Sequence, residues 1–150
     1  MNLILTADGG SRGNPGPSAY GFAIWIIDET NLLIKDRVQE IVLQETPHFT
    51  QGKYIGNTTN NQAEWQGVLA GLEYIQGNLS HFSNLFIALD SELVIKQLTG
   101  QYKVKNPGLI PLHRQAMSIL KEFNNYSLNH IYRQYNKIAD GLVNEALDNI

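Results

Sequence analysis

Two short apolar segments of this chain end in an aspartate, and they constrain the fold more than any other feature of the sequence. "LILTAD" covers residues 3–8 and "LFIALD" covers residues 85–90, so the two carboxyl groups belong to Asp8 and Asp90. Short apolar runs of this kind are typical of buried strands. In α/β sheets, functional groups gather outside the carboxyl ends of the strands. If the two segments are parallel neighbours, Asp8 and Asp90 lie side by side at one edge of the sheet.

The rest of the chain predicts a mixed sheet with helices packed on it. A Gly- and Pro-rich loop is expected over residues 9–21, and residues 20–27 and 32–43 flank "DETN" in the manner of a β-hairpin. Residues 44–57 have no clear periodicity and predict a long loop, whose role is left open. The later elements are expected, in chain order, as helix 61–75, strand 85–90, helix 91–98, a helix within 106–123, strand 126–133 and closing helix 136–150. The closing helix is expected to pack through Ile138, Leu142, Leu147 and Ile150.

Length and composition predict one globular domain over residues 1–150, and a monomer is the simplest assembly. The 150 residues are 43% hydrophobic and 17% charged, and they contain no apolar run long enough to span a membrane. No signal peptide is expected, because the first residues lack a basic segment before the apolar run. The absence of cysteine excludes disulfides and thiolate metal sites, and it fits a cytoplasmic location. A net charge of −3 disfavours nucleic-acid binding through the whole surface, so a phosphate-bearing partner has to meet a local basic patch.

Four carboxylates are candidate site residues, although each has an ordinary structural explanation. Asp8 could start a turn and Asp90 could cap the helix over 91–98. Glu64 follows Asn61 by three residues, which is the spacing of a helix capping box. Asp140 lies in the first turns of the closing helix, where the helix dipole favours negative charge.

A cluster of all four has a different meaning. Clustered carboxylates repel one another and resist ionisation when buried, unless cations neutralise them. Oxygen ligands suit a hard cation such as Mg²⁺ or Mn²⁺. Two such ions about 4 Å apart stabilise both oxygens of an in-line phosphoryl displacement. The cluster therefore favours metal ligands over a general acid and base.

Four segments, "TADGGSRGNPGPSAYG", "TNNQAEWQGVLAGL", "LDSELVIKQLTG" and "NKIADGLVNEAL", occur in this order. With them the chain resembles the type 1 ribonuclease H (ribonuclease HI) family over nearly its whole length. The resemblance implies an α/β fold with a mixed five-stranded sheet, three strands antiparallel and two parallel, and helices on both faces. It implies that Asp8, Glu64, Asp90 and Asp140 hold two Mg²⁺ ions, with Mn²⁺ as a substitute. It also implies hydrolysis of the RNA strand of an RNA/DNA hybrid, leaving a 3′-hydroxyl and a 5′-phosphate.

The resemblance also implies residues that bind the hybrid. In family members, the loop after the first aspartate and the Asn-rich turn before the glutamate touch the minor groove. Asparagine donates and accepts hydrogen bonds, which suits recognition of the 2′-hydroxyl, and glycine lets the backbone approach a strand closely. For Asn14 and Asn61, turn and cap roles remain alternatives. The matching residues are Gly9, Gly10, Asn14, Asn60 and Asn61, with Thr59 for a DNA-strand phosphate.

Basic residues near the expected hybrid path are few. Lys96, Lys103 and Lys105 follow the second aspartate strand, although a solvated face is an alternative for the cluster "YKVKN". The segment "GQYKVKNPGLIPL" is at best a reduced form of the basic handle that some relatives carry between two helices. We therefore expect modest affinity for the hybrid and a shallow dependence on salt.

The chain resembles the short-loop members of the family that lack its mobile histidine. The segment before the closing helix reads "HIYRQYNKIAD", and Arg133 is the candidate substitute because it stays cationic and can hold a phosphate. His130 falls inside a predicted strand and is expected to be structural. The other three histidines match no functional position and are expected on the surface or in packing: His48, His81 and His113.

Three alternative functions stay open at this level. Another nuclease of the same fold would keep the acidic site but lack the Gly-rich loop and the Asn-rich turn together. A silent hybrid-binding module would normally have lost a carboxylate, and all four are present here. A fragment of a retroelement polyprotein is the third alternative.

Overall fold

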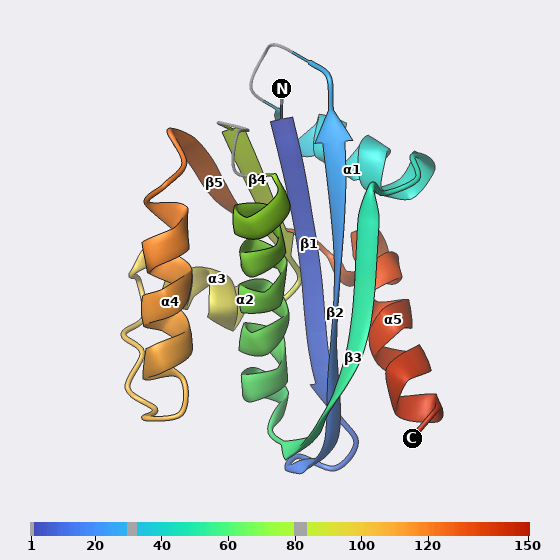
Figure 1. Cartoon of the computed structure of the whole chain (residues 1–150), viewed down its shortest axis with the longest axis vertical. Helices are drawn as coiled ribbons and strands as arrows, with labels where there is room; N and C mark the ends of the chain where they lie inside the picture. Colours follow the sequence, from blue (N-terminus) through green and yellow to red (C-terminus); the bar gives the residue numbers. More distant parts are fainter. Residues whose placement is uncertain (1, 30–32, 80–83) are drawn as a thin grey trace.

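The computed structural model describes residues 2–29, 33–79 and 84–150, which form one mixed sheet flanked by helices (Figure 1). The strands are β1 (Asn2–Ser11), β2 (Gly16–Ile27), β3 (Phe49–Thr58), β4 (Asn84–Leu89) and β5 (Asn125–His130). The helices are α1 (Lys35–Gln44), α2 (Asn60–Asn78), α3 (Glu92–Thr99), α4 (Ile110–Leu120), the 3₁₀ turn η1 (Arg133–Tyr135) and α5 (Lys137–Asp148). The strand order β3-β2-β1-β4-β5 places β1 at the centre.

The register of β1 and β4 brings the two aspartates together. β1 pairs antiparallel with β2 and parallel with β4, and Ala7 lies opposite Leu89. Asp8 follows Ala7 within β1 and Asp90 directly follows Leu89 at the end of β4, so both carboxyl groups reach the same edge of the sheet. β5 adds a second parallel strand beside β4, and β3 adds an antiparallel strand beside β2. The predicted five-stranded mixed sheet is confirmed.

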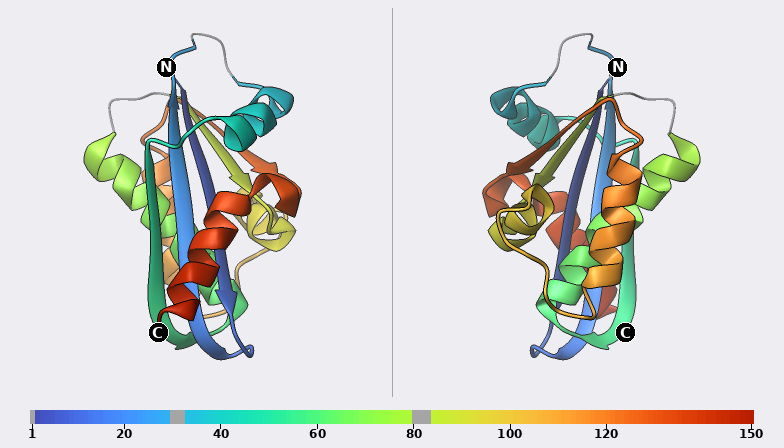
Figure 2. Two further views of the ribbon diagram at one scale, coloured as in Figure 1. Left: turned by 90° about the vertical axis from the view of Figure 1, so that its right-hand side faces the viewer. Right: turned by 90° about the vertical axis from the view of Figure 1, so that its left-hand side faces the viewer.

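Helices cover both faces of the sheet, as predicted (Figure 2). α2 and α4 lie on one face, whereas α1 and α5 lie on the other. The largest core cluster joins the sheet to α2, α3 and α4. Within it the buried Trp65 indole donates to Gln97 Oε1 at 2.8 Å, which ties α2 to α3. No helix among the described residues combines the length and apolar character that crossing a membrane requires.

The predicted third strand was placed wrongly. Residues 32–43 were expected as a strand, but Lys35–Gln44 is helix α1 and buries Val38, Ile41 and Val42. Their spacing of three and four residues is the helical period, which explains the helix. The antiparallel strand is β3, inside the segment expected to be a loop. β3 is an edge strand that is exposed along most of its length, so its sequence lacks the alternation that marks a half-buried strand.

Two further expectations need correction. The predicted loop over 9–21 is mostly strand, because β1 continues to Ser11 and β2 begins at Gly16. The expected packing of the closing helix is wrong only for Ile150, which is 63% exposed. Leu147 is buried, Ile138 packs against the core and Leu142 packs against Gly21 and Gly52, while Ala139 and Val143 are further buried residues of α5. The predicted end of the 91–98 helix is confirmed, since Gly100 adopts a left-handed φ of 85° after α3.

Candidate active site

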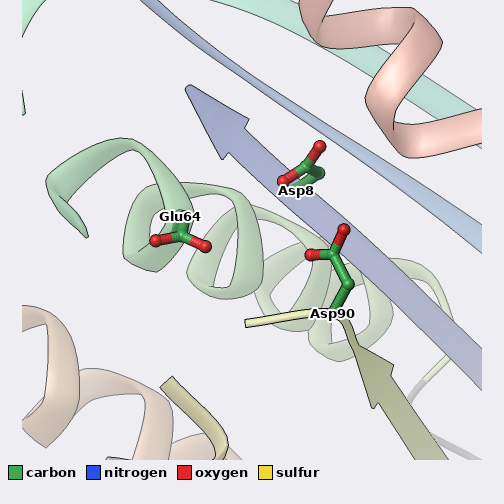
Figure 3. Close-up of side chains that lie close together, drawn as sticks. All are labelled: Asp8, Glu64 and Asp90. Carbon is green, nitrogen blue, oxygen red and sulfur yellow. The ribbon is translucent and has the colours of Figure 1, made fainter. Parts of the chain in front are cut away.

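Three carboxylates from distant parts of the chain meet where β1 runs past the end of β4. Asp8 lies in β1, Glu64 in α2, and Asp90 directly after β4, and their side chains point toward a common centre (Figure 3). One oxygen of each lies within 4.8 Å of the others. The sequence prediction that these groups cluster is confirmed.

A close contact between β1 and α2 brings Glu64 to Asp8. A Cβ atom on Gly9 would lie 2.2 Å from the backbone carbon of Ala63, the residue before Glu64. Only glycine permits this approach. By contrast, a Cβ on Gly10 would meet Val143 at an ordinary 3.5 Å. Gly9 is therefore required for the geometry of the cluster, irrespective of any contact with substrate.

The ordinary explanations of these three carboxylates do not hold. Asp8 is inside β1, opposite Gly21, and starts no turn. The N-cap of α3 is Ser91, not Asp90. The N-cap of α2 is Thr59, whose side chain accepts from the Gln62 amide, so no capping box begins at Asn61. Capping therefore does not account for Asp90 or Glu64.

Burial makes ionisation of the cluster unfavourable. Burial raises the pKa of Asp8 to about 8, and the negative charges of Asp90 and Asp140 add to the effect. Burial likewise raises the pKa of Glu64 to about 7, against the opposing influence of a Ser91 hydrogen bond. The pKa of Asp90 is also raised by burial, although the positive charge of Arg133 and a hydrogen bond from Asn136 oppose the rise.

Asp140 and Arg133 belong to the same site. Asp140 hydrogen-bonds Asp8, and Arg133 acts electrostatically on both Glu64 and Asp90. All five residues line a groove of about 480 Å³. Asp140 is not in the three-carboxylate cluster, so its predicted role as a metal ligand stays a prediction.

The Asn-rich turn is fastened to the β1–β2 connection. The Ser11 amide donates to Asn60 Oδ1 at 2.7 Å, and the Asn60 amide donates to Asn14 Oδ1 at 2.9 Å. Both asparagine side chains use their oxygen atoms within the protein, which leaves their amide nitrogens as the groups suited to a ligand. Ser11 and Asn60 line the groove, as do Gly9 and Gly10 of the predicted hybrid-binding residues.

The predicted basic residues lie outside the groove lining identified in the described part of the chain. Lys96 pairs with Glu92 at 2.9 Å and its ammonium lies 5.0 Å from the Tyr102 ring centre. Lys103 and Lys105 are exposed between α3 and α4. The fold thus leaves Lys103 and Lys105 open to a partner, whereas Lys96 would have to exchange its ion pair.

The histidines divide as follows. His113 packs edge-on against Trp65, with ring centres 5.7 Å apart, and His48 is exposed. His81 lies outside the described residues. His130 differs from the expectation of a purely structural role, because it ends β5 and lines the groove beside Tyr132. Sequence reasoning missed it because a histidine in a strand gives no signal of which face it occupies.

Two neutral residues that support the carboxylates were also missed. The Ser91 hydroxyl oxygen accepts a hydrogen bond from the Val94 amide at 3.2 Å. Ser91 also hydrogen-bonds the Glu64 carboxyl group, and it must be the donor when that group is ionised. Asn136 hydrogen-bonds Asp90. Serine and asparagine next to helix starts are ordinary capping residues, so sequence alone did not distinguish them.

Comparison with known proteins places the chain in a family. The family described as "Reverse transcriptase-like" matches residues 45–146. Ribonuclease HI of Halobacterium salinarum is 36% identical over 141 residues, which are 94% of this chain and 62% of that protein. The crystal structure of RNase H1 from the same organism superposes with a TM-score of 0.82 at 34% identity, covering 100% of both chains.

The chain belongs to the type 1 ribonuclease H family.

Two further proteins show the same likeness. The bifunctional protein Rv2228c of Mycobacterium tuberculosis is 34% identical over 148 residues, or 99% of this chain, and the chain spans 36% of its length. LC11-RNase H1, solved in complex with an RNA/DNA hybrid, has a TM-score of 0.78 at 34% identity and covers 98% of this chain and 97% of that one. The family resemblance seen in the four sequence segments is confirmed.

Proposed function

We propose that this ribonuclease H family member is a metal-dependent endonuclease that hydrolyses the RNA strand of RNA/DNA hybrids, leaving 3′-hydroxyl and 5′-phosphate ends. The observation that carries the proposal is the convergence of Asp8, Glu64 and Asp90 within 4.8 Å in a chain of this family. A relative of similar fold, LC11-RNase H1, was solved with an RNA/DNA hybrid, which supports the choice of substrate.

The carboxylate cluster fits divalent cations. The three groups are oxygen donors, they are partly buried, and burial together with mutual repulsion raises their pKa values. Such a set favours binding of a hard cation, which removes the repulsion. Asp8, Glu64 and Asp90 would hold the metal, and Asp140 would complete a site for two Mg²⁺ ions. When bound, such ions stabilise the charge on the attacking and leaving oxygens of a phosphodiester.

The protein's own residues orient the substrate. Arg133 offers a permanent positive charge beside Glu64 and Asp90, and we assign it to a phosphate of the RNA strand in place of the family histidine. The amide nitrogens of Asn14 and Asn60 are assigned to the minor groove, where the 2′-hydroxyl distinguishes RNA from DNA.

Other groups complete this proposed surface. Gly10 leaves the groove floor open, since nothing but Val143 at 3.5 Å lies near its missing side chain. The substrate roles of Gly9, Thr59, Asn61 and the lysines Lys96, Lys103 and Lys105 stay predictions.

The activity is tested with an end-labelled RNA/DNA hybrid incubated with Mg²⁺, Mn²⁺ or EDTA. We expect cutting of the RNA strand alone, dependent on metal and abolished by Asp90→Asn. No cutting in either metal, with the hybrid still bound, would indicate a silent binding module. Cutting of DNA strands or branched junctions would indicate another nuclease on this fold.

The role of Arg133 has its own test. Arg133→Ala should reduce kcat/KM for the hybrid at least tenfold, and Arg133→Lys should recover part of the loss because it restores the charge without the planar donor set. Arg114→Ala, an exposed charge on α4, is the matched control. Equal effects of Arg133→Ala and Arg114→Ala would refute the assignment.

The cytoplasmic location, the monomeric state and the single-domain organisation remain predictions from the sequence. Sedimentation of the purified chain with and without a short hybrid tests the monomer.

A further inference from the structure

The side chain of Asn136 is buried at the junction of three elements that carry the carboxylates. It precedes α5, which bears Asp140, and it is 1% exposed. Its Nδ2 atom donates to the carbonyl oxygen of Ala7 at 2.9 Å, the residue before Asp8. It also hydrogen-bonds the carboxylate of Asp90. One neutral side chain therefore touches the strand of Asp8, the Asp90 carboxylate and the start of α5.

The hydrogen-bond pattern permits only one orientation of this amide. An ionised carboxylate and a backbone carbonyl can only accept, so both bonds use hydrogens of Nδ2. Asn136 Oδ1 is buried without a hydrogen-bond partner among the described residues. A flipped amide would turn that oxygen toward two acceptors and lose both bonds. The two hydrogen bonds donated by Nδ2 are thus the reason for the orientation.

This use of the side chain departs from what an asparagine before a helix ordinarily does. Such a residue usually accepts from a free amide of the first helical turn, which stabilises the helix by about 1 kcal/mol. Asn136 makes no side-chain capping bond to α5. Its backbone is held instead, by the bond from its amide to Arg133 O at 2.9 Å and the bond from the Asp140 amide to its carbonyl at 3.1 Å. The side chain is therefore directed at the carboxylate site rather than at its own helix.

We propose that Asn136 is a positioning residue, which holds the Asp90 carboxylate in its metal-binding orientation and locks it to the strand of Asp8. The inference rests on the proposed function only in that Asp90 is a metal ligand. Residues that orient a ligand from outside the coordination sphere typically change metal affinity by about 10- to 100-fold when removed. Asn136→Ala and the nearly isosteric Asn136→Leu should therefore weaken Mn²⁺ binding by at least tenfold.

The chain offers a matched control in Asn2. This residue is 3% exposed, and its Nδ2 donates to the carbonyl oxygen of Glu29 at 2.8 Å, at the other end of β1. Asn2→Ala removes the same kind of buried bond from the same strand, far from the carboxylates. It should lower the unfolding midpoint as Asn136→Ala does, while its Mn²⁺ affinity stays at the wild-type value.

The experiment is calorimetric titration of the full chain with Mn²⁺ without nucleic acid, alongside urea unfolding of each variant. Loss of affinity in both Asn136 variants, with wild-type affinity in Asn2→Ala, is the expected result. Wild-type affinity in both Asn136 variants would overturn the inference alone. Absence of Mn²⁺ binding by the wild-type chain would overturn the proposed two-ion function and the inference with it.

A second measurement covers variants that do not fold. In the wild-type chain, addition of Mg²⁺ should shift the Asn136 side-chain amide resonances and leave those of Asn2 in place. If the backbone amide of Gly9 shifts while the Asn136 side chain does not, Asn136 does not sense the ligand set and the inference is wrong.

Discussion

Replacement of Asp8 by asparagine should stabilise the metal-free protein, and increasingly so as the pH rises. Burial raises the Asp8 pKa from 3.8 to about 8, so the protonated form favours folding. The stability linked to this group is fully present below about pH 4 and is lost as the pH rises through about 8. Asn136 and the other site residues are unchanged in Asp8→Asn, which isolates this one charge.

The size of the effect follows from the shift. One pKa unit corresponds to about 1.4 kcal/mol, so the whole shift corresponds to about 6 kcal/mol at high pH. Partial access of Asp8 to water reduces this amount. We therefore expect the stability advantage of Asp8→Asn over wild type to grow by about 2–4 kcal/mol between pH 5 and pH 9.

The assay is urea unfolding in EDTA at several pH values, with Asp28→Asn as the control because Asp28 is exposed and remote from the cluster. Mg²⁺ added at pH 9 should stabilise the wild type more than Asp8→Asn, because the ion binds the ionised folded state. Parallel pH curves for wild type and Asp8→Asn would show that burial does not penalise this carboxylate, and the reasoning would be wrong.

Two further predictions concern packing. Gly9→Ala places a Cβ 2.2 Å from the Ala63 backbone, so it should destabilise the fold by about 3 kcal/mol or more and weaken Mn²⁺ binding. Gly10→Ala is the control. Equal unfolding midpoints for the two variants would contradict the close-contact argument. Trp65→Phe leaves the buried Gln97 oxygen without its donor, so it should lower the free energy of unfolding by about 1–3 kcal/mol, as measured by urea unfolding. Recovery of stability in the double variant Trp65→Phe/Gln97→Leu would confirm the cause.

The sequence was sufficient to predict the carboxylates and the sheet edge on which they meet. Apart from Thr6, "LILTAD" and "LFIALD" are apolar up to their final aspartate because β1 and β4 are covered on both faces, and such segments are recognisable without tertiary information. The aspartates that end them then follow from the parallel pairing. The sequence made this parallel pairing plausible, but only the structure shows its register, in which Ala7 lies opposite Leu89.

The third strand shows where local patterns were insufficient. β3 lies at the sheet edge and most of its residues are exposed, so burial imposes no period of two on its sequence. α1 is short, and its apolar residues Val38, Ile41 and Val42 were attributed to a strand although they are spaced as in a helix. β3 was missed because burial constrains the sequence of an edge strand only weakly. α1 was missed because a helical spacing of apolar residues was taken for that of a strand.

The sequence by itself identified the candidate carboxylates, because their chemistry and their place at the end of a local element are visible without tertiary structure. These residues are Asp8, Glu64, Asp90 and Asp140. Only the tertiary structure decided which neutral and cationic groups serve them. Lys96 is occupied by Glu92, Ser91 supports Glu64, and Asn136 turns away from its own helix toward Asp90. A hydrogen bond or an ion pair depends on which atoms lie within about 3 Å, and such distances between residues far apart in the chain exist only once the elements have packed.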